Sequence, residues 1–324
     1  MKAIEQYQNT INEFIAANKF SKFPQELYEP LDYIMALGGK RMRPVMVLMA
    51  CDLMNGKMED AVHAAMAIET FHNFTLIHDD IMDNAPVRRG KTTVHEKWNV
   101  NTAILSGDVM LIEAYALLMK YENDLLRSIL NIFNKSAIEV CEGQQIDMNF
   151  ESRVDVSLSE YIHMITLKTA VVLGASLEVG ALIAGVSKKQ AQHLYEFGKN
   201  MGIAFQLRDD YLDLYADPEK FGKQVGGDVI ANKKTFMLIK ALELAKDNDA
   251  IELNKWLQAS EFNPIEKVSA IKNIFDKLAI PALLNEEVKH YANLAWQAFE
   301  QVDATASNKE MMADFMSGLL AREV

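Results

Sequence analysis

The sequence is poor in the residues that interrupt helices and in those that form disulfides. Its 324 residues include only 15 glycines, 7 prolines and 2 cysteines. Two cysteines cannot build a disulfide framework, and neither belongs to a CxxC pair, so we expect Cys51 and Cys141 to be buried thiols in a reducing cytoplasm. The scarcity of glycine and proline leaves long stretches in which helices can run without interruption.

Basic charge and long apolar runs are also scarce. Lysine and arginine total 33 against 45 aspartates and glutamates, which gives a net charge of −12 and a pI near 5.1. A chain this acidic is not expected to bind nucleic acid through a broad basic surface. No run of about 18 uninterrupted apolar residues is present, and the N-terminal stretch lacks the apolar core of a signal peptide. We therefore expect a cytoplasmic protein without stable membrane insertion.

The remaining pattern is helical. Hydrophobic residues make up 50% of the chain and charged residues 24%, as in globular proteins with a sizeable core. Apolar side chains recur every three or four positions over residues 64–82, which predicts a helix that ends before Pro86. Residues 101–119 are apolar nearly all round, which predicts a buried helix. Residues 187–190 (SKKQ) fit a capping box that begins a helix reaching as far as Pro218, and no alternating strand pattern stands out.

Two short acidic clusters share one spacing. They are DDIMD at 79–83 and DDYLD at 209–213. Positions i, i+1 and i+4 share one side of a helix, and they hold Asp79, Asp80 and Asp83 in the first row and Asp209, Asp210 and Asp213 in the second. Like charges at this spacing destabilise a helix by about 0.2–0.5 kcal/mol per pair. One such row is often only a solvated acidic face, but two rows at the same spacing, each followed by basic residues and glycine, indicate a function.

Carboxylate rows of this kind suit hard divalent cations, above all Mg²⁺, which takes oxygen ligands. A calcium-binding EF-hand loop does not fit, because Asn84 and Gly90 stand where that loop needs glycine and glutamate. Mg²⁺ is usually completed by substrate phosphates rather than by protein groups alone. The two rows therefore predict a ligand that carries phosphate groups.

Basic residues gather in short motifs along the same chain. These motifs are GGKRMRP (38–44), VRRGK (87–91), LKT (167–169), FGK (221–223) and NKKT (232–235). Arginine can bind phosphate oxygens through two parallel hydrogen bonds, and lysine acts as a point charge. Each motif alone is typical of a solvated surface. The chain has neither a GxxxxGK[ST] loop nor the kinase motifs, which disfavours the common nucleotide-binding enzymes.

Taken together, the motifs resemble those of the trans-isoprenyl diphosphate synthases, also called polyprenyl synthetases. The matching motifs are GGKRMRP, HDDIMDNAPVRRG with GKTTVH, GQQID, KTA, FQLRDDYLD, FGKQVGGD and NKKT. They occur in the family's order over residues 38–235, and this order makes the resemblance specific. Residues 236–324 add no motif to it.

The resemblance implies one all-α prenyltransferase domain over residues 1–324, a single large helical bundle around a central cavity, and usually a homodimer. It implies head-to-tail condensation of isopentenyl diphosphate with dimethylallyl, geranyl or farnesyl diphosphate. The two aspartate rows would face each other across the mouth of the cavity and hold three Mg²⁺ ions against the allylic diphosphate. The released diphosphate would take up the proton, since no histidine or carboxylate stands out as a general base.

The roles of single residues also come from the resemblance. Direct metal ligands would be Asp79, Asp83 and Asp209, with water-mediated or supporting roles for Asp80, Asp210 and Asp213. The allylic diphosphate would be bound by Arg88, Lys168, Gln206, Lys223 and Lys233. Isopentenyl diphosphate would be bound at a second, metal-free site by Lys40, Arg43, His72 and Arg89. The reacting centre would be lined by Gln144 and Thr169, and Asp147 would support the lysine and metal network.

A few positions leave alternatives open. Thr92 and Ala231 depart from the commonest residues of the family, proline and an acidic residue, but neither change removes a group that the chemistry needs. A lone histidine on an apolar helix is usually a core residue, and only the matched segment makes His72 a ligand of diphosphate. His78 adjoins Asp79, but Mg²⁺ prefers oxygen ligands.

An aromatic residue before the first aspartate row is expected to limit the length of the product. At 1.5 Å per residue, Phe74 lies about 7.5 Å and Phe71 about 12 Å before Asp79 along a helix. The small side chain of Thr75 leaves room that a second aromatic residue would close. The family pattern then favours geranylgeranyl diphosphate as the product, with farnesyl diphosphate or a longer chain as the alternative. Both rings could instead be plain core residues, with the floor of the cavity at Met110, Leu111 or Ala114.

Two other classes of protein are weighed against this one. Class I terpene cyclases share the helical fold and the first aspartate row, but they generally replace the second row and lack GGKRMRP. A non-catalytic subunit of a heteromeric synthase would be expected to lose aspartates or basic ligands. Both rows and GGKRMRP are intact, so the sequence favours an active transferase.

Overall fold

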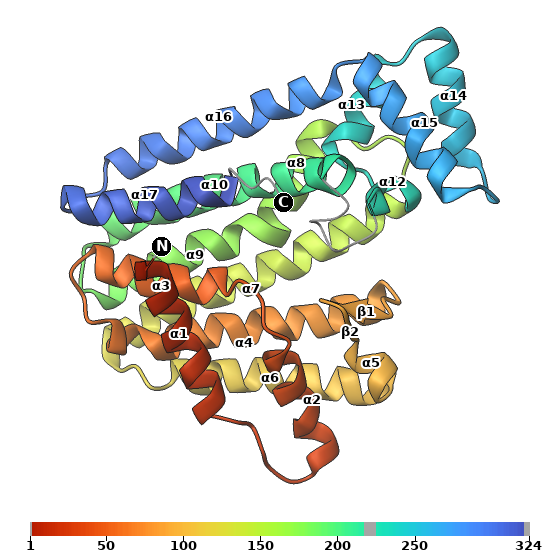
Figure 1. The fold of residues 1–324 in the computed structure, drawn as a ribbon. Helices are drawn as coiled ribbons and strands as arrows, with labels where there is room; N and C mark the ends of the chain where they lie inside the picture. The colour runs from red at the N-terminus through yellow and green to blue at the C-terminus, as the bar shows by residue number, and fades with distance from the viewer. Residues whose placement is uncertain (1, 217–224, 321–324) are drawn as a thin grey trace. The chain divides into compact units, whose positions relative to one another are not determined.

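The computed structural model describes residues 2–216 and 225–320 of the chain (Figure 1). The first elements are α1 (Lys2–Ala17), α2 (Gln25–Ala36), α3 (Met42–Leu53), α4 (Met58–Met82), β1 (Val87–Arg88), β2 (Lys91–Thr92), α5 (Val94–Lys97), α6 (Val100–Leu118) and α7 (Asn123–Glu151). The later elements are α8 (Leu158–Ile165), the π-helix η1 (Thr166–Ala170), α9 (Val171–Ile183), α10 (Lys188–Tyr215), α12 (Gly227–Ile230), α13 (Phe236–Leu244), α14 (Asp247–Gln258), α15 (Pro264–Lys277), α16 (Ile280–Glu300) and α17 (Ala306–Leu320). The all-α prediction is confirmed, apart from one short hairpin of two residues in each strand that the sequence pattern did not reveal.

The chain divides into two compact units. Unit 1 consists of Met1–Asn134, Ala175–Tyr195 and Val302–Met312, and unit 2 consists of Lys135–Gly174, Glu196–Gln301 and Ala313–Val324. Helices α7, α9, α10 and α17 contribute residues to both units. The prediction of one domain over residues 1–324 stays a prediction.

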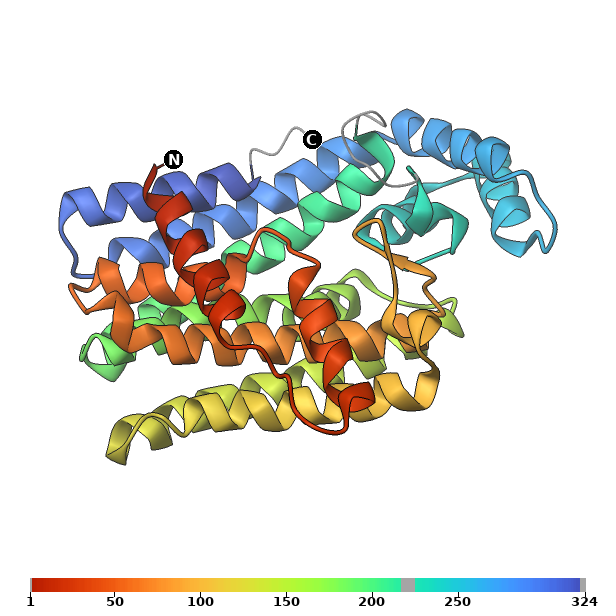
Figure 2. The same cartoon turned by 60° about the horizontal axis from the view of Figure 1, so that its bottom comes forward.

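Helix α4 is central to unit 1, where it packs against α3 and α6, and Figures 1 and 2 both show α4 and α6 side by side. Its buried face is rich in alanine, which allows neighbouring helices to approach closely. The negative charges of Glu59 and Asp60 in its first turn interact favourably with the positive end of the helix dipole. The helix ends at Met82, with Asp83 as its C-cap, so the first aspartate row occupies the last turn.

Helix α6 differs from its prediction as a buried helix. Its partners in unit 1 cover only one side, and Ile104, Leu105 and Ile112 are exposed by 40%, 57% and 66%. By length and composition alone, α6 would pass as a membrane span, and so would Leu158–Ile183. This is weak evidence for a membrane, because core helices meet the same criteria, and 67% of the most apolar window in Leu158–Ile183 is buried. The expected cytoplasmic location stays a prediction.

The core of unit 2 is built by the aromatic and aliphatic faces of α8, α10, α13, α15 and α16. Tyr161, Phe236 and Phe275 are among its largest fully buried side chains. Side-chain caps begin two of these helices. Thr235 accepts a hydrogen bond from the backbone of Leu238 at the start of α13, and Asn263 accepts bonds from the first turn of α15. Such caps satisfy backbone donors that a helix end leaves open.

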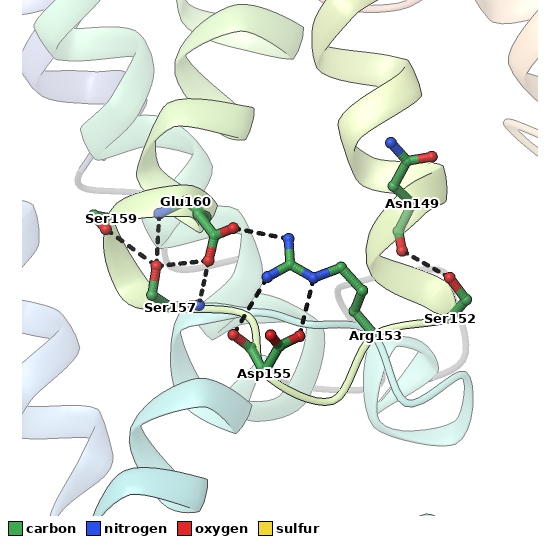
Figure 3. A network of polar contacts seen from close by, with 7 residues as sticks. All are labelled: Asn149, Ser152, Arg153, Asp155, Ser157, Ser159 and Glu160. Carbon is green, nitrogen blue, oxygen red and sulfur yellow. Dashed lines mark hydrogen bonds and ion pairs between the residues drawn. The ribbon is translucent and has the colours of Figure 1, made fainter.

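A polar network fixes the start of α8 (Figure 3). Ser157 and Glu160 form a capping box, in which each side chain binds the backbone nitrogen of the other residue. Arg153 donates to Glu160 at 2.7 Å and to Asp155 at 3.0 Å. The hydrogen bond from Arg153 lowers the pKa of Glu160 to about 2 and also lowers that of Asp155. The network sets the direction of α8, which leads into η1.

Two local expectations need correction. Ser187 caps α10 as predicted and accepts from the backbone nitrogen of Gln190 at 3.3 Å. The side chain of Gln190, however, accepts from the backbone of Asp303 at 2.7 Å, so it serves a tertiary contact. Cys51 is buried as expected, but Cys141 is exposed, because it lies on the outer side of α7. No spacing rule places a lone cysteine on one helix face rather than another.

Gly143 marks the place in unit 2 where α7 and η1 approach each other most tightly at the backbone. A Cβ atom at this position would lie 2.8 Å from the Cα of Lys168 and closer still to its backbone nitrogen. Backbone atoms cannot move aside as a flexible side chain can, so only glycine fits without displacing one of the two helices.

We therefore expect Gly143→Ala to lower the free energy of unfolding by about 1–3 kcal/mol, because it forces apart two packed backbones. Gly318→Ala is the matched control, since Gly318 lies in α17 with nothing within 4 Å of the added methyl group. That control should raise stability by about 0.4–1 kcal/mol by reducing the entropy of the unfolded chain. Urea unfolding of both variants tests this, and equal stabilisation by the two changes would contradict it.

Candidate active site

The first aspartate row lies at the carboxyl end of α4 in unit 1. Asp83 is exposed and Asp79 is partly exposed, whereas Asp80 is only 1% exposed. The guanidinium group of Arg88 binds Asp80 through two of its nitrogen atoms. Nε lies 2.9 Å from Oδ1 and 2.8 Å from Oδ2 of Asp80, and Nη2 lies 2.7 Å from Oδ1. The roles expected for Arg88 and Asp80 did not include this pairing, which arises because burial requires a counter-charge for Asp80.

Arg88 and Arg89 are presented by the β1–β2 hairpin. Val87 pairs with Thr92, and Arg88 pairs with Lys91. The two residues of the turn, Arg89 and Gly90, have φ values of 52° and 73°. Positive φ at both positions is the requirement of a type I′ turn. Arginine is an unfavourable residue there, so the sequence signal for the turn is weak and the hairpin was missed.

A group of cationic side chains lies beside this hairpin. The Nη1 atom of Arg43 lies 3.2 Å from Nε2 of His72, so the histidine accepts from the arginine at this atom. Arg89 donates to the backbone oxygen of Gly38, in the motif that also carries Lys40. The structure thus brings together His72, Arg43 and Arg89, three of the four residues expected to bind isopentenyl diphosphate. The fourth, Lys40, is two residues from Gly38, which Arg89 contacts.

The electrostatics of this group favour an anion. Burial and nearby arginines hold the pKa of His72 well below its usual value, so its ring is neutral at pH 7. Burial lowers the pKa of Arg43 to about 10 and also lowers that of Arg89. Among the described residues, neither Arg43 nor Arg89 forms an ion pair. The carboxylate that acts on both groups, Glu69, is already paired with Arg41. Two charged guanidinium groups held close together with no ion pair of their own make a site for an anion.

The second aspartate row lies near the carboxyl end of α10 in unit 2. Asp209 is exposed. Asp210 is buried and accepts hydrogen bonds from Tyr161 of α8 and, at 3.0 Å, from Gln206. Burial raises the pKa of Asp210 to about 8, and burial together with Asp228 raises that of Asp213 to about 6. Asp210 is therefore turned into the protein, and the more accessible carboxylate of this row is Asp209.

Lys168 and Thr169 lie on η1, a π-helical turn that the sequence pattern did not predict. Lys168 donates to Asp147 of α7 at 2.6 Å, and Thr169 donates to Gln206 of α10 at 3.2 Å. Single π-turns inside helices are frequent at functional sites, because the extra residue turns side chains off the regular helical spacing. Gln144 lies on α7 directly after Gly143, in the segment that meets η1.

Lys233 lies in the turn between α12 and α13. Its backbone nitrogen donates to the oxygen of Asp228 at 2.9 Å, and its ammonium lies 3.6 Å from the Asp228 carboxylate. The backbone nitrogen of Asp228 in turn donates to Asp213 at 3.0 Å. This chain of contacts ties the NKKT segment to the second aspartate row. Lys223, also expected to bind diphosphate, lies outside the described residues.

Lys267 supports the same turn and was missed from the sequence. It is 0% exposed, and its ammonium donates to the backbone oxygen of Ile230 at 3.1 Å and to Asn232 at 2.7 Å. Burial lowers its pKa. A lysine in α15, beyond the last motif, carries no sequence signal for this contact. Only the fold shows which lysines are anchored and which reach solvent.

The residues expected to limit product length lie in unit 1. Phe71 is buried and packs edge-to-face on Phe133, with ring centroids 5.3 Å apart. Phe74 is half-buried between Phe71 and His78, at 5.7 and 4.8 Å. The hydroxyl of Thr75 donates to the backbone oxygen of His72 at 2.8 Å, as is common for threonine in a helix. The contacts of Phe71 fit a core residue, and Phe74 is the more accessible of the two rings.

The accessible carboxylates fit Mg²⁺. Asp79, Asp83 and Asp209 offer hard oxygen donors at two helix ends, and these are ligands that Mg²⁺ accepts together with water and phosphate oxygens. Over residues 2–216 and 225–320, no group of three or more His, Cys, Asp or Glu side chains is placed so that it could hold a metal ion by itself. An ion that a diphosphate completes does not need such a group.

Known proteins resemble this chain over almost its whole length. A family model described as polyprenyl synthetase matches residues 24–276. A geranylgeranyl diphosphate synthase of Sulfolobus acidocaldarius is 39% identical over 289 residues, which cover 88% of this chain and 87% of the relative. A short chain isoprenyl diphosphate synthase of Methanothermobacter thermautotrophicus is 34% identical over 98% of this chain and 97% of its own. A crystal structure of a geranylgeranyl pyrophosphate synthase matches with a TM-score of 0.94 and 43% identity, over 99% of both chains.

The helical fold and these matches define the protein as a prenyltransferase with the all-α isoprenoid synthase fold. The chain belongs to the polyprenyl synthetase family. The family resemblance read from the ordered motifs is thereby confirmed. The roles of individual residues stay predictions, which the geometry of each unit supports to different degrees.

Proposed function

We propose that the chain condenses isopentenyl diphosphate with an allylic diphosphate in a Mg²⁺-dependent head-to-tail reaction, with geranylgeranyl diphosphate as its main product. The relatives described as geranylgeranyl diphosphate synthases support this product. The relative described only as a short chain isoprenyl diphosphate synthase fits the same reaction with the length left open.

The observation that carries the proposal is the cationic group of Arg43, His72 and Arg89. It forms no ion pair with a carboxylate of the described residues. A transferase that condenses an allylic diphosphate with isopentenyl diphosphate needs a second diphosphate site, in which isopentenyl diphosphate is bound without metal. A terpene cyclase acts on one diphosphate and has no such need, so this group favours condensation over cyclisation.

The allylic diphosphate is assigned to the aspartate rows and their basic neighbours. Asp79, Asp83 and Asp209 would hold the metal, while Lys168 and Lys233 would bind diphosphate oxygens. Bound Mg²⁺ would supply Lewis-acid stabilisation of the charge that develops on the departing diphosphate. Arg88 is already engaged with Asp80, so its role includes neutralising that buried carboxylate and fixing the hairpin.

Proton removal is not assigned to His72. Its pKa is lowered, and its Nε2 atom already accepts from Arg43, so the ring is a weak base with one nitrogen occupied. Its better-supported role is to orient Arg43. The released diphosphate remains the proposed proton acceptor.

Asp79→Ala is expected to lower condensation activity by about 10³-fold or more, because several kcal/mol of metal-dependent stabilisation would be lost. The measurement is incorporation of labelled isopentenyl diphosphate with dimethylallyl diphosphate as the starter, over a range of Mg²⁺ concentrations. Asp124→Ala in the first turn of α7 is the control, since it removes an exposed aspartate outside both rows. Near-normal activity of Asp79→Ala with an unchanged melting temperature would end the proposal.

Phe74→Ala is expected to shift the main product to one at least one isoprene unit longer, because it removes a half-buried ring that limits the space near Asp79. Phe74→Tyr keeps the ring and should leave the product unchanged. Chromatography of the dephosphorylated products measures both. If neither variant changes the product, the floor lies elsewhere, with Met110, Leu111 and Ala114 as the candidates named from the sequence.

We also propose that the protein is a homodimer that buries the exposed side of α6. Ile104, Leu105, Ile112 and Met119 are exposed by 40%, 57%, 66% and 62% and follow one another at helical spacing. Contiguous apolar side chains of this kind usually mark an interaction surface. A second copy of the same chain is the occupant that the family resemblance implies.

Ile112→Glu should convert the dimer to monomer, because two charges would be buried against an apolar surface. Ile251→Glu is the matched control, since Ile251 in α14 is 69% exposed and lies on another helix. Sedimentation velocity of both variants gives the masses. A wild-type monomer, or a dimer that persists in Ile112→Glu, would refute the assignment of this surface.

A further inference from the structure

Unit 1 contains a cavity that none of the aspartates of the two rows lines. Its volume is about 690 Å³, within the range of about 300–1,000 Å³ that small-molecule sites occupy. Its walls are formed by residues of α1, α2, α4 and α6 and of the segments that directly follow α1, α2 and α6. In Figure 1, α1 and α2 (red) lie over α4 (orange) and α6 (yellow).

The cavity is on the far side of α4 from the metal row. Thr70 of α4 lines it, and Thr70 precedes Asp79 by nine residues, about two and a half turns of α-helix. The two side chains therefore leave opposite sides of the same helix. None of Asp79, Asp80, Phe74 or Arg43 lines the cavity. It is not a continuation of the site at which the diphosphates are assigned.

The walls combine an apolar interior with positive charge. The apolar lining includes Phe14, Ile15, Phe20, Met35, Met66 and Leu117. The lining also holds acidic groups that already have partners. Asp32 accepts from the backbone of Phe20 and from Ser21, and Glu113 pairs with Lys22 at 2.5 Å.

Two exposed lysines of the lining are left without such partners. Lys19 and Lys120 form no ion pair with any residue that the structure describes. Lys120 is close enough to His63, another lining residue, to lower the pKa of that histidine. Lys22 is paired with Glu113 and Arg41 with Glu69. The remaining charges of the lining are therefore those of Lys19, Lys120 and Asp32, and their sum is positive. An aliphatic chain with an anionic head group matches a cavity of this composition.

We propose that this cavity is a regulatory site for a prenyl diphosphate, with the tail among the apolar side chains and the diphosphate at Lys19 and Lys120. The identity of the ligand rests on the proposed function, because the product of that reaction is an amphiphile of this kind. The site is distinct from both substrate sites.

The cavity shares a wall with the group assigned to isopentenyl diphosphate. Gly38 and Arg41 line it, and they flank Lys40 in the sequence. Gly38 accepts the hydrogen bond from Arg89, and Arg41 is the N-cap of α3, the helix that carries Arg43. A ligand that displaces Gly38 and Arg41 would therefore also displace Arg89 and Arg43, the anion-binding side chains connected to them. Occupancy should therefore raise the apparent KM for isopentenyl diphosphate by about fivefold or more, the range of typical coupling between sites.

The test is calorimetric titration of the full chain with geranylgeranyl diphosphate in EDTA, where the aspartate rows hold no metal. Lys19→Glu/Lys120→Glu should weaken binding by about tenfold or more. Lys188→Glu/Lys189→Glu makes the same change of charge on exposed residues of α10 that do not line the cavity, and binding should be unchanged. Inorganic diphosphate should bind the wild type and the Lys19/Lys120 variant equally, because it has no tail for the cavity and the isopentenyl site remains open to it in EDTA. In steady-state assays, only the Lys19/Lys120 variant should lose inhibition by the product, with its basal rate unchanged.

Three results would overturn the proposal. Equal binding by the two lysine variants would show that the cavity is not the site. Loss of binding in Arg43→Gln, with binding kept in the Lys19/Lys120 variant, would place the ligand in the isopentenyl site. Palmitate binding as tightly as geranylgeranyl diphosphate would replace the prenyl diphosphate with a general fatty anion. Failure of the proposed function is distinguishable, since it would show as an inactive wild-type chain whatever the calorimetry gives.

Discussion

The repulsion between like charges at the ends of two helices is the constraint on which this structure depends. Three aspartates occupy the last turn of α4, and three more lie near the end of α10. The carboxyl end of a helix is the negative end of its dipole, so each row is disfavoured both by its own charges and by the helix that carries it. Cationic groups and hydrogen-bond donors of the protein offset part of this cost, and a bound cation of the kind proposed would offset more of it.

The fold neutralises the aspartates unequally. Arg88 binds Asp80, Tyr161 and Gln206 hold Asp210, and the backbone of Asp228 binds Asp213. The exposed members, Asp83 and Asp209, are left facing solvent. Two motifs with the same aspartate spacing thus place their carboxylates in different surroundings, because burial demands a partner for one carboxylate and leaves its neighbour accessible.

The basic side chains also differ in whether they have an acidic partner. Arg41 is buried against Glu69 at 2.5 Å, whereas Arg43, two residues later, faces His72 and Arg89 and forms no ion pair with a described residue. Around the cavity beneath α1 and α2, the acids have partners and two lysines do not. In each case the group that we propose for ligand binding is the one that forms no ion pair with the described residues.

Much of the site followed from the order of motifs, and the sequence by itself determined the family, the helical fold and the two acidic rows. Periodicity predicts the helix over residues 64–82 because apolar spacing is local, and the spacing of aspartates is equally local. Only the tertiary structure decided which aspartates are buried, that Arg88 pairs with Asp80, that Lys267 holds the NKKT turn, and that one side of α6 stays exposed. These depend on which distant segments pack against each helix face, and burial and counter-charge are properties of that packing, which no single stretch of sequence contains.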